Sequence, residues 1–234
     1  MLPSTLITLA LSAVACAVDT WGPSVSFLRP SNSTLVYTST IMQPPEAPTQ
    51  PKGGFLTIWP GISNGTGDLV QSCLDRYPPG ENCSDIVLQP GEWCAVASVF
   101  GNLGFPNATL LQHDAPGSIV KAGQHTKLEY ILEPNNLNWT QIVTNVASKK
   151  LLSTLSTRSE AYMRSWGTAV ECQMDCNPPG LHYYFNTTWK FKVAEPAFAL
   201  RSKLNATFSK PVSADGGITW TVDKITIPAT KKAN

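Results

Sequence analysis

Charged residues are scarce in this 234-residue sequence, since Asp, Glu, Lys and Arg together make up only 14% of it. The formal net charge is +1, and no basic run occurs, which argues against nucleic acid or an anionic membrane surface as a partner. No segment carries the apolar period of an amphipathic helix. After the first 17 residues no stretch approaches the roughly 18 apolar residues of a membrane span, so we expect none.

The patterns of common catalytic and metal sites are also missing. The three histidines form no H-x-H motif followed by glutamate, and the cysteines form no C-x-x-C pair, so neither a cupin-type metal site nor a zinc site is expected. No serine lies in G-x-S-x-G, the signature of nucleophilic acyl transfer. The sequence therefore predicts no metal and no cofactor.

Glycoside hydrolysis needs two carboxylates across one bond, and the sequence offers only a weak signal for it. None of the strand glutamates forms an E-x-D or E-x-E pair on one strand face. Two of them could still meet across strands, so this chemistry stays open. The candidates are Glu92, Glu129, Glu133 and Glu171.

The first 17 residues predict a signal peptide. An apolar run at 6–14 precedes Ala15-Cys16-Ala17, which fits a small-x-small cleavage site. We place the cut after Ala17, with Ala13-Val14-Ala15 as the alternative site. Seven N-x-Ser/Thr sequons support a secreted glycoprotein. They are Asn32, Asn64, Asn82, Asn107, Asn138, Asn186 and Asn205.

Five cysteines remain after this cleavage. In an oxidising compartment they predict two disulfides and one spare thiol. Cys172 and Cys176 are placed to close a short turn, and Cys83 and Cys94 to tie a Pro-Gly loop to the next strand. Cys73, within a predicted strand, is then the buried thiol.

Short apolar segments separated by Gly, Pro and Asn predict an all-β fold. We expect a single-domain antiparallel β-sandwich of jelly-roll type over residues 54–234. Residues 18–53 are predicted as an N-terminal extension with one strand at 35–40 and a proline-rich connector at 43–52. The further predicted strands are 54–60, 68–74, 92–100, 109–113, 127–133, 139–145, 151–155, 160–172, 182–193, 197–204 and 218–227.

The strand predicted at 160–172 contains the strongest candidate site. Two-residue alternation places Tyr162, Arg164 and Trp166 on one face, with smaller apolar residues on the other. Two aromatic rings around one guanidinium suit the lining of a ligand groove. The alternative is that Arg164 is a surface cation stacked between two rings.

Other strands repeat a combination of tryptophan and glutamine. Trp59 ends one strand before a Pro-Gly turn, Gln71 lies on the next, and Trp139 shares a strand face with Gln141. A buried glutamine needs a hydrogen-bond partner, in the core or on a ligand, and both readings stay open. His113 followed by Asp114 is a weak candidate for a general base.

Several of these segments resemble one family of small secreted fungal proteins. They are Ile58-Trp59-Pro60-Gly61, Asn64-Gly65-Thr66-Gly67-Asp68-Leu69 with Gln71, Glu92-Trp93-Cys94, Trp139-Thr140-Gln141 and Arg164-Ser165-Trp166-Gly167-Thr168-Ala169. The family is similar to the hetero-Diels–Alderases of fungal tropolone-sesquiterpenoid biosynthesis. The match covers most of the mature chain, from about residue 54 to 223, but its motifs are specific for the family and not for the reaction.

The resemblance implies an enzyme that joins a tropolone o-quinone methide to a humulene-type sesquiterpene alkene. Its partners would be these small hydrophobic substrates, and a homodimer is left open. From the residues we expect Arg164, Gln71, Gln141 and His113 as catalytic groups. Trp59, Trp139, Tyr162 and Trp166 are expected as the walls of an apolar substrate cavity.

The rival hypothesis is a secreted carbohydrate-active protein, either a polysaccharide lyase or glucanase or a sugar-binding module. The two hypotheses predict different cavities. A cycloaddition site should be a closed and mostly apolar pocket, whereas a polysaccharide site should be a long open cleft lined with polar groups.

Overall fold

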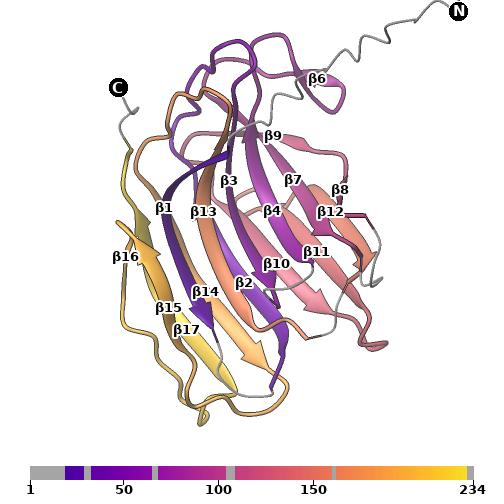
Figure 1. Ribbon diagram of the computed structural model, residues 1–234, viewed down its shortest axis with the longest axis vertical. Helices are drawn as coiled ribbons and strands as arrows, with labels where there is room; N and C mark the ends of the chain where they lie inside the picture. The colour runs from indigo at the N-terminus through magenta and orange to yellow at the C-terminus, as the bar shows by residue number, and fades with distance from the viewer. Residues whose placement is uncertain (1–18, 29–32, 65–67, 104–108, 160–161, 231–234) are drawn as a thin grey trace, which may run out of the picture.

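The computed structural model describes residues 19–28, 33–64, 68–103, 109–159 and 162–230. They form two large antiparallel sheets that lie face to face, with no helix among the described residues (Figure 1). The predicted all-β sandwich of jelly-roll type is confirmed. The predicted signal peptide lies outside the described residues.

We call the two layers sheet A and sheet B. Sheet A contains, in spatial order, β15 (Ala199–Leu204), β1 (Asp19–Leu28), β13 (Ser165–Gln173), β3 (Phe55–Ser63), β4 (Leu69–Arg76), β7 (Glu92–Gly101) and β8 (Leu111–Asp114), and β9 (Ser118–Lys121) also pairs with β7. Sheet B contains β12 (Leu151–Arg158), β11 (Asn138–Asn145), β10 (Thr126–Leu132), β2 (Leu35–Gln43), β14 (His182–Phe191), β17 (Thr219–Ile227) and β16 (Thr207–Phe208). A small hairpin joins β5 (Asn82–Cys83) to β6 (Ile86–Val87).

The N-terminal segment is part of the sandwich, which corrects its prediction as an extension with one strand. It supplies two strands: β1 lies in sheet A between β13 and β15, and β2 lies in sheet B between β10 and β14. The prediction missed β1 because Gly22 and Pro23 interrupt its alternation. The structure places these two residues at an irregularity in the pairing of β1 with β13.

Large aromatic side chains fill the space between the sheets. Trp93, Trp139, Trp166 and Trp189 are all fully buried. Burying rings of this size is a large apolar contribution to folding. Direct hydrogen bonds also join the layers: Thr168 Oγ1 donates to Tyr184 Oη at 2.6 Å.

Gln141 forms another polar link between the layers. Its Nε2 donates to the Ser98 carbonyl oxygen at 2.7 Å, and Ser72 Oγ donates to its Oε1 at 3.3 Å. The side chain is fully buried, so its polar atoms depend on these protein partners. This environment corrects the prediction of Gln141 as a catalytic group and makes it a structural residue.

We therefore expect Gln141→Leu to lower the free energy of unfolding by about 1–3 kcal/mol, because it leaves the buried Ser98 carbonyl without its donor. Urea denaturation followed by fluorescence measures this effect. Gln124→Leu, at an exposed turn, is the matched control and should change stability much less. Equal stability of wild type and Gln141→Leu would contradict the structural role.

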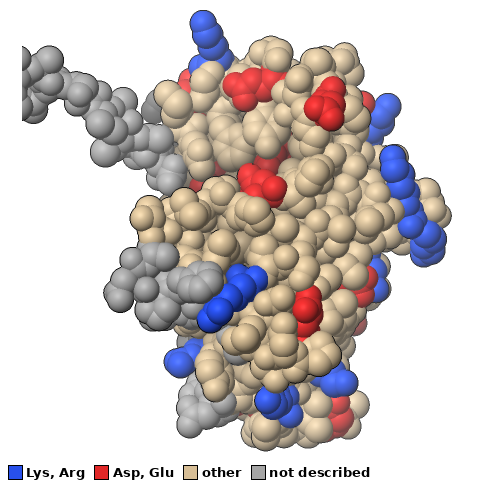
Figure 2. Space-filling model, turned by 90° about the vertical axis from the view of Figure 1, so that its right-hand side faces the viewer, with Lys and Arg blue, Asp and Glu red and all other residues tan. Residues whose placement is uncertain are grey.

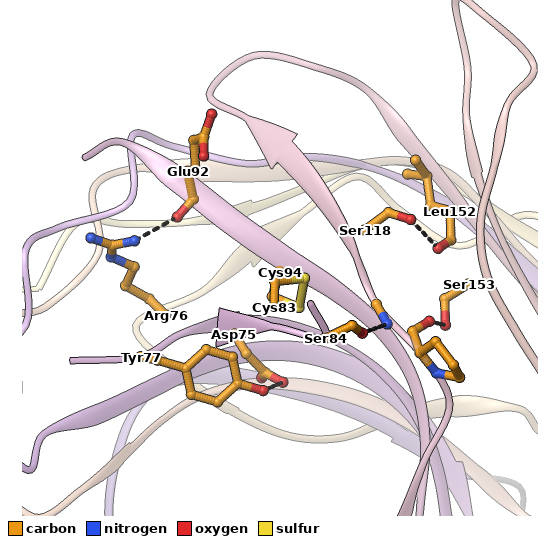
Figure 3. The surroundings of a disulfide bond; sticks show 12 residues. Asp75, Arg76, Tyr77, Cys83, Ser84, Glu92, Cys94, Ser118, Leu152 and Ser153 are labelled. Atoms are coloured by element: carbon orange, nitrogen blue, oxygen red, sulfur yellow. Dashed lines mark hydrogen bonds between the residues drawn. A yellow bond between two sulfur atoms is a disulfide. The ribbon is translucent and has the colours of Figure 1, made fainter. Parts of the chain in front are cut away.

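Both predicted disulfides are confirmed. Cys83–Cys94 ties the β5–β6 hairpin to β7, and Cys172–Cys176 closes the turn after β13, while Cys73 is a buried free thiol. Figure 3 shows the first disulfide beside Tyr77, whose hydroxyl donates to Asp75 Oδ2 at 3.2 Å. Two disulfides are typical of proteins from an oxidising, extracellular compartment.

Charged side chains are dispersed over the surface drawn in Figure 2, and neither sign gathers into one large patch there. Among the described residues, no helix is long and apolar enough to cross a membrane. In the same part of the chain, no group of three or more His, Cys, Asp or Glu side chains is arranged to hold a metal ion.

Candidate ligand-binding site

The predicted row of Tyr162, Arg164 and Trp166 does not line one face, and this prediction is wrong. Tyr162 is 64% exposed and Arg164 is also exposed, whereas Trp166 is fully buried in the core. The reason is that β13 begins only at Ser165. Two-residue alternation applies only within a strand, and Tyr162 and Arg164 precede this strand.

Trp139 and His113 also lie away from a shared site. Trp139 is fully buried on the inner face of sheet B, so it is a core residue and not a cavity wall. His113 is exposed on β8, and the carboxylate of Asp114 beside it accepts a hydrogen bond from Gln112 Nε2 at 2.9 Å. The prediction for both residues rested on their residue types, because the sequence does not show where each one lies in the sheets.

Trp59 and Gln71 lie close together on the outer face of sheet A, which is the face turned away from sheet B. In the strand register Gly61 lies opposite Gln71 on β4 and opposite Gly167 on β13. Gly167 in turn lies opposite Ser26 on β1. Two adjacent glycines on neighbouring strands leave the sheet without side chains between Ser26 and Gln71.

A pocket of about 350 Å³ lies over these two glycines. We call it the Trp21–Trp59 pocket. Ligand sites typically span roughly 300–1,000 Å³, so its volume lies at the lower end of the range of small-molecule sites. The lining residues are Trp21, Ser24, Val25, Ser26, Trp59, Gly61, Ser63, Leu69, Ser165, Gly167, Thr168 and Ala169.

The irregularity in β1 explains how Trp21 reaches this face. Trp21 and Ser24 are three residues apart, so in a regular strand they would point to opposite faces. The pairing shifts between them, from Trp21 with Glu171 to Ser24 with Ala169. The additional residue of this bulge brings both side chains to the pocket.

The two indole rings form a rigid corner of the pocket. Their centroids are 6.3 Å apart and their planes meet at 87°, an edge-to-face contact. Glu171 holds one of the rings, because Trp59 Nε1 donates to its Oε2 at 3.0 Å. Gln173 Nε2 donates to the other carboxylate oxygen at 3.2 Å, which fixes Glu171 in this position.

Serine hydroxyls provide the polar groups of the pocket. Ser165 Oγ donates to the Ser63 carbonyl oxygen at 2.9 Å. Within the described part of the chain the hydroxyls of Ser24 and Ser26 make no hydrogen bond to protein, so they are available to a ligand. No charged side chain lies among the described residues of the lining.

A row of buried polar groups continues from the pocket along β4. Gln71 is 7% exposed with a buried Oε1 that has no hydrogen-bond partner, and the buried thiol of Cys73 follows it. Asp75, at the end of the row, is 6% exposed. Burial raises the pKa of Asp75 to about 7, and the nearby Asp114 and Glu171 carboxylates act in the same direction. Asp75 therefore retains a substantial protonated fraction at neutral pH.

Sequence reasoning found one pocket residue, Trp59, and its neighbour Gln71, and it missed most of the others. Trp21, Ser24 and Ser26 fell in the segment predicted as an extension. Their signal was present in residues 24–27, where serine alternates with Val25 and Phe27 as expected for a half-buried strand. The serines alone would not have identified a pocket, because its floor consists of glycines on two other strands.

The sequons remain predictions. Asn82, Asn186 and Asn205 are exposed, while Asn64 and Asn138 are half-buried. Asn32 and Asn107 lie outside the described residues.

No protein-family model and no curated protein sequence matches the chain. Among solved structures it is similar to scytalido-glutamic peptidase with a transition-state-analogue inhibitor, with a TM-score of 0.52 and 14% identity over 88% of this chain and 99% of that one. The same peptidase with a peptide-based analogue gives a TM-score of 0.51 and 13% identity over the same shares. A Bacillus licheniformis beta-glucanase gives a TM-score of 0.32 and 10% identity over 89% of this chain and 78% of that one. The peptidase similarity shows a shared β-sandwich fold and does not identify an activity.

Proposed function

We propose that the protein binds small, uncharged and mostly apolar molecules in the Trp21–Trp59 pocket, and that it is a hetero-Diels–Alderase. The proposed reaction joins a tropolone o-quinone methide to a humulene-type alkene. The observation that carries the proposal is the character of the pocket: two perpendicular indoles, a glycine floor, hydroxyl groups and no charged side chain in its described lining.

The cycloaddition step itself requires no nucleophile and no proton transfer from the pocket. One C–C and one C–O bond form from the π electrons of the two partners, no atom leaves, and no proton has to move. The protein contributes by holding the partners face to face, where effective molarities reach about 10⁵–10⁸ M. A hydroxyl of Ser24 or Ser26 would donate to the heterodiene oxygen, and this hydrogen bond strengthens as charge develops there.

Hydrolytic chemistry is less suited to this pocket. Cleavage of a peptide or glycosidic bond requires groups that activate water or protonate a leaving group. The described lining contains no acid and no histidine. Glu171 lies behind Trp59, where it accepts hydrogen bonds from that indole and from Gln173.

The second candidate is a carbohydrate-active protein, most simply a sugar-binding module. One observation favours it: Trp21 is 56% exposed at the pocket edge. An exposed indole next to free serine hydroxyls also suits a sugar ring, which has an apolar face and polar edges. In this case the pocket would bind one sugar unit at the end of a chain.

The test is incubation of the purified protein with humulene and a hydroxymethyl tropolone, which loses one water molecule to form the o-quinone methide before the cycloaddition, with adducts detected by mass spectrometry. We expect wild type to form the adduct and to show no binding or cleavage of glucans and uronans. Binding or cleavage of these polysaccharides without adduct formation would overturn the main proposal in favour of the second.

Two variants test whether the activity resides in the Trp21–Trp59 pocket. Trp59→Ala should reduce adduct formation roughly 10- to 100-fold, because it removes one wall and exposes the ligand to water. Arg164→Ala, which changes an exposed residue outside the lining, should retain wild-type rates. The reverse result would show that the activity depends on the surface around Arg164 and not on the Trp21–Trp59 pocket.

A further inference from the structure

A buried glutamine needs partners for both ends of its amide, and two of the three buried glutamines in the described chain have them. Gln50 Nε2 donates to the Asn177 carbonyl oxygen at 3.0 Å, and Gln50 Oε1 accepts from the Asn177 backbone N–H at 2.9 Å. Gln141 likewise has a protein partner at each end. Gln71, which is only 7% exposed, differs: within the described part of the chain its buried Oε1 has no hydrogen-bond partner.

Gln71 borders the floor of the Trp21–Trp59 pocket. Two lining residues are its neighbours: Leu69 precedes it on the same face of β4, and Gly61 lies opposite it on β3. A Cβ atom at Gly61 would lie only 3.1 Å from Gln71 Cβ, whereas opposite Cβ atoms in an antiparallel pair are ordinarily about 4.5–5.5 Å apart. The Gln71 side chain therefore begins directly beside the glycine floor, in space that a larger residue at Gly61 would occupy.

The unpaired oxygen of Gln71 adds an acceptor to the polar groups of the pocket. Buried polar atoms in folded proteins are nearly always satisfied, and leaving one unpaired is costly. The hydroxyls of Ser24 and Ser26 can donate to a ligand, whereas an amide oxygen can only accept. An uncharged ring that carries one hydroxyl group and one carbonyl oxygen would satisfy both kinds of group at once.

We propose that Gln71 Oε1 accepts a hydrogen bond from the hydroxyl group of the tropolone and selects for ligands with a free hydroxyl. This assignment rests on the proposed function, which places the tropolone in this pocket. The flexible side chain of Gln71 turns its amide over Gly61 towards the ligand, and the serines remain available for the carbonyl oxygen of the ring. A tropolone whose hydroxyl is methylated leaves Gln71 Oε1 unsatisfied and binds more weakly.

The experiment is calorimetry with tropolone and its methyl ether as the probes, in a mildly acidic buffer that keeps the tropolone hydroxyl protonated. We expect wild type to bind tropolone roughly tenfold or more tightly than the ether, because only tropolone can donate to Gln71. Gln71→Met keeps the length of the side chain and removes the amide, so the preference should fall to about twofold or less. Gln112→Met, which replaces an exposed amide on β8 outside the pocket lining, is the matched control and should keep the wild-type preference.

Thermal unfolding separates a ligand-binding role of Gln71 from a structural one. Gln71→Met should be at least as stable as wild type, because it replaces an unsatisfied buried polar group by an apolar one of similar shape. Gln141→Leu, in contrast, removes an amide that has protein partners at both ends. A marked loss of stability in Gln71→Met would show that its amide has a structural role, and would overturn the inference.

The binding outcomes separate this inference from the proposed function. Equal affinity of wild type for tropolone and its methyl ether overturns the role of Gln71, and so does an unchanged preference in folded Gln71→Met, even if wild type forms the adduct. Absence of tropolone binding to wild type overturns it together with the proposed tropolone site. Loss of the preference in Gln71→Met alone supports the role even if wild type forms no adduct, in which case only the proposed reaction fails.

Discussion

Gly167→Leu is expected to abolish adduct formation while leaving the protein folded. Gly167 forms part of the pocket floor and lies opposite Ser26. A Cβ atom at this position would lie 3.2 Å from the Val25 carbonyl oxygen and 3.5 Å from Ser26 Cβ. The first distance is tight and requires a small adjustment of β1, but the remaining atoms of leucine project into the pocket.

The predicted loss is at least roughly 100-fold in rate, about 2.7 kcal/mol, because a leucine fills the space that the substrate ring requires. Gly180→Leu is the matched control, since its Cβ would meet only Pro45 Cβ at 3.4 Å outside the pocket. Adduct yield by mass spectrometry and thermal unfolding are measured together. Wild-type rates in a folded Gly167→Leu protein would show that the reaction takes place elsewhere.

The second prediction is that Asp75→Asn and His182→Asn change the pH dependence of stability in opposite directions. Asp75 has its pKa raised to about 7, chiefly by burial. His182 has its pKa lowered to about 4, also chiefly by burial. Both side chains are almost fully buried, at 6% and 1% exposure, so both prefer their uncharged forms in the folded state.

The signs of the two effects follow from proton binding. Between about pH 4 and pH 7 the folded state holds the Asp75 proton more tightly than the unfolded state does, so this group lowers stability as the pH rises. Between about pH 4 and pH 6.5 the unfolded state binds more protons at His182, so this group raises stability as the pH rises. In the wild type the two slopes, each about 1.4 kcal/mol per pH unit, largely cancel from pH 4 to pH 6.5.

Each variant removes one of the two slopes. Asp75→Asn should become more stable as the pH rises from 4 to 6.5, and His182→Asn should become less stable as the pH rises from 4 to 7. Asparagine keeps the approximate shape of aspartate, and it can donate to the Gly180 carbonyl oxygen as His182 Nδ1 does. Urea denaturation at several pH values measures both slopes. Parallel pH profiles for the two variants and wild type would contradict the assigned pKa shifts.

Strand positions could be predicted well because local composition sets them. The predicted strands at 92–100, 139–145 and 218–227 correspond to β7, β11 and β17 within one or two residues. The alternation of apolar side chains and the Gly, Pro and Asn residues between them are visible in the chain itself. The prediction failed where one strand was extended too far, over residues 162–164, because no local signal marks the start of β13.

The sequence by itself determined the all-β class and most strands, since both depend on local composition and spacing. It also predicted both disulfides and the buried thiol, whose pairing the structure then fixed. Only the tertiary structure decided which side chains share a surface, because this depends on strand register and on the bulge in β1. The tertiary structure shows that the candidate site lies at Trp21 and Trp59 and not at Arg164 and Trp166. It also shows that Gln141 lies in the core. A hollow over two glycines cannot be read from the chain, because Gly61 and Gly167 become neighbours only when β3 pairs with β13.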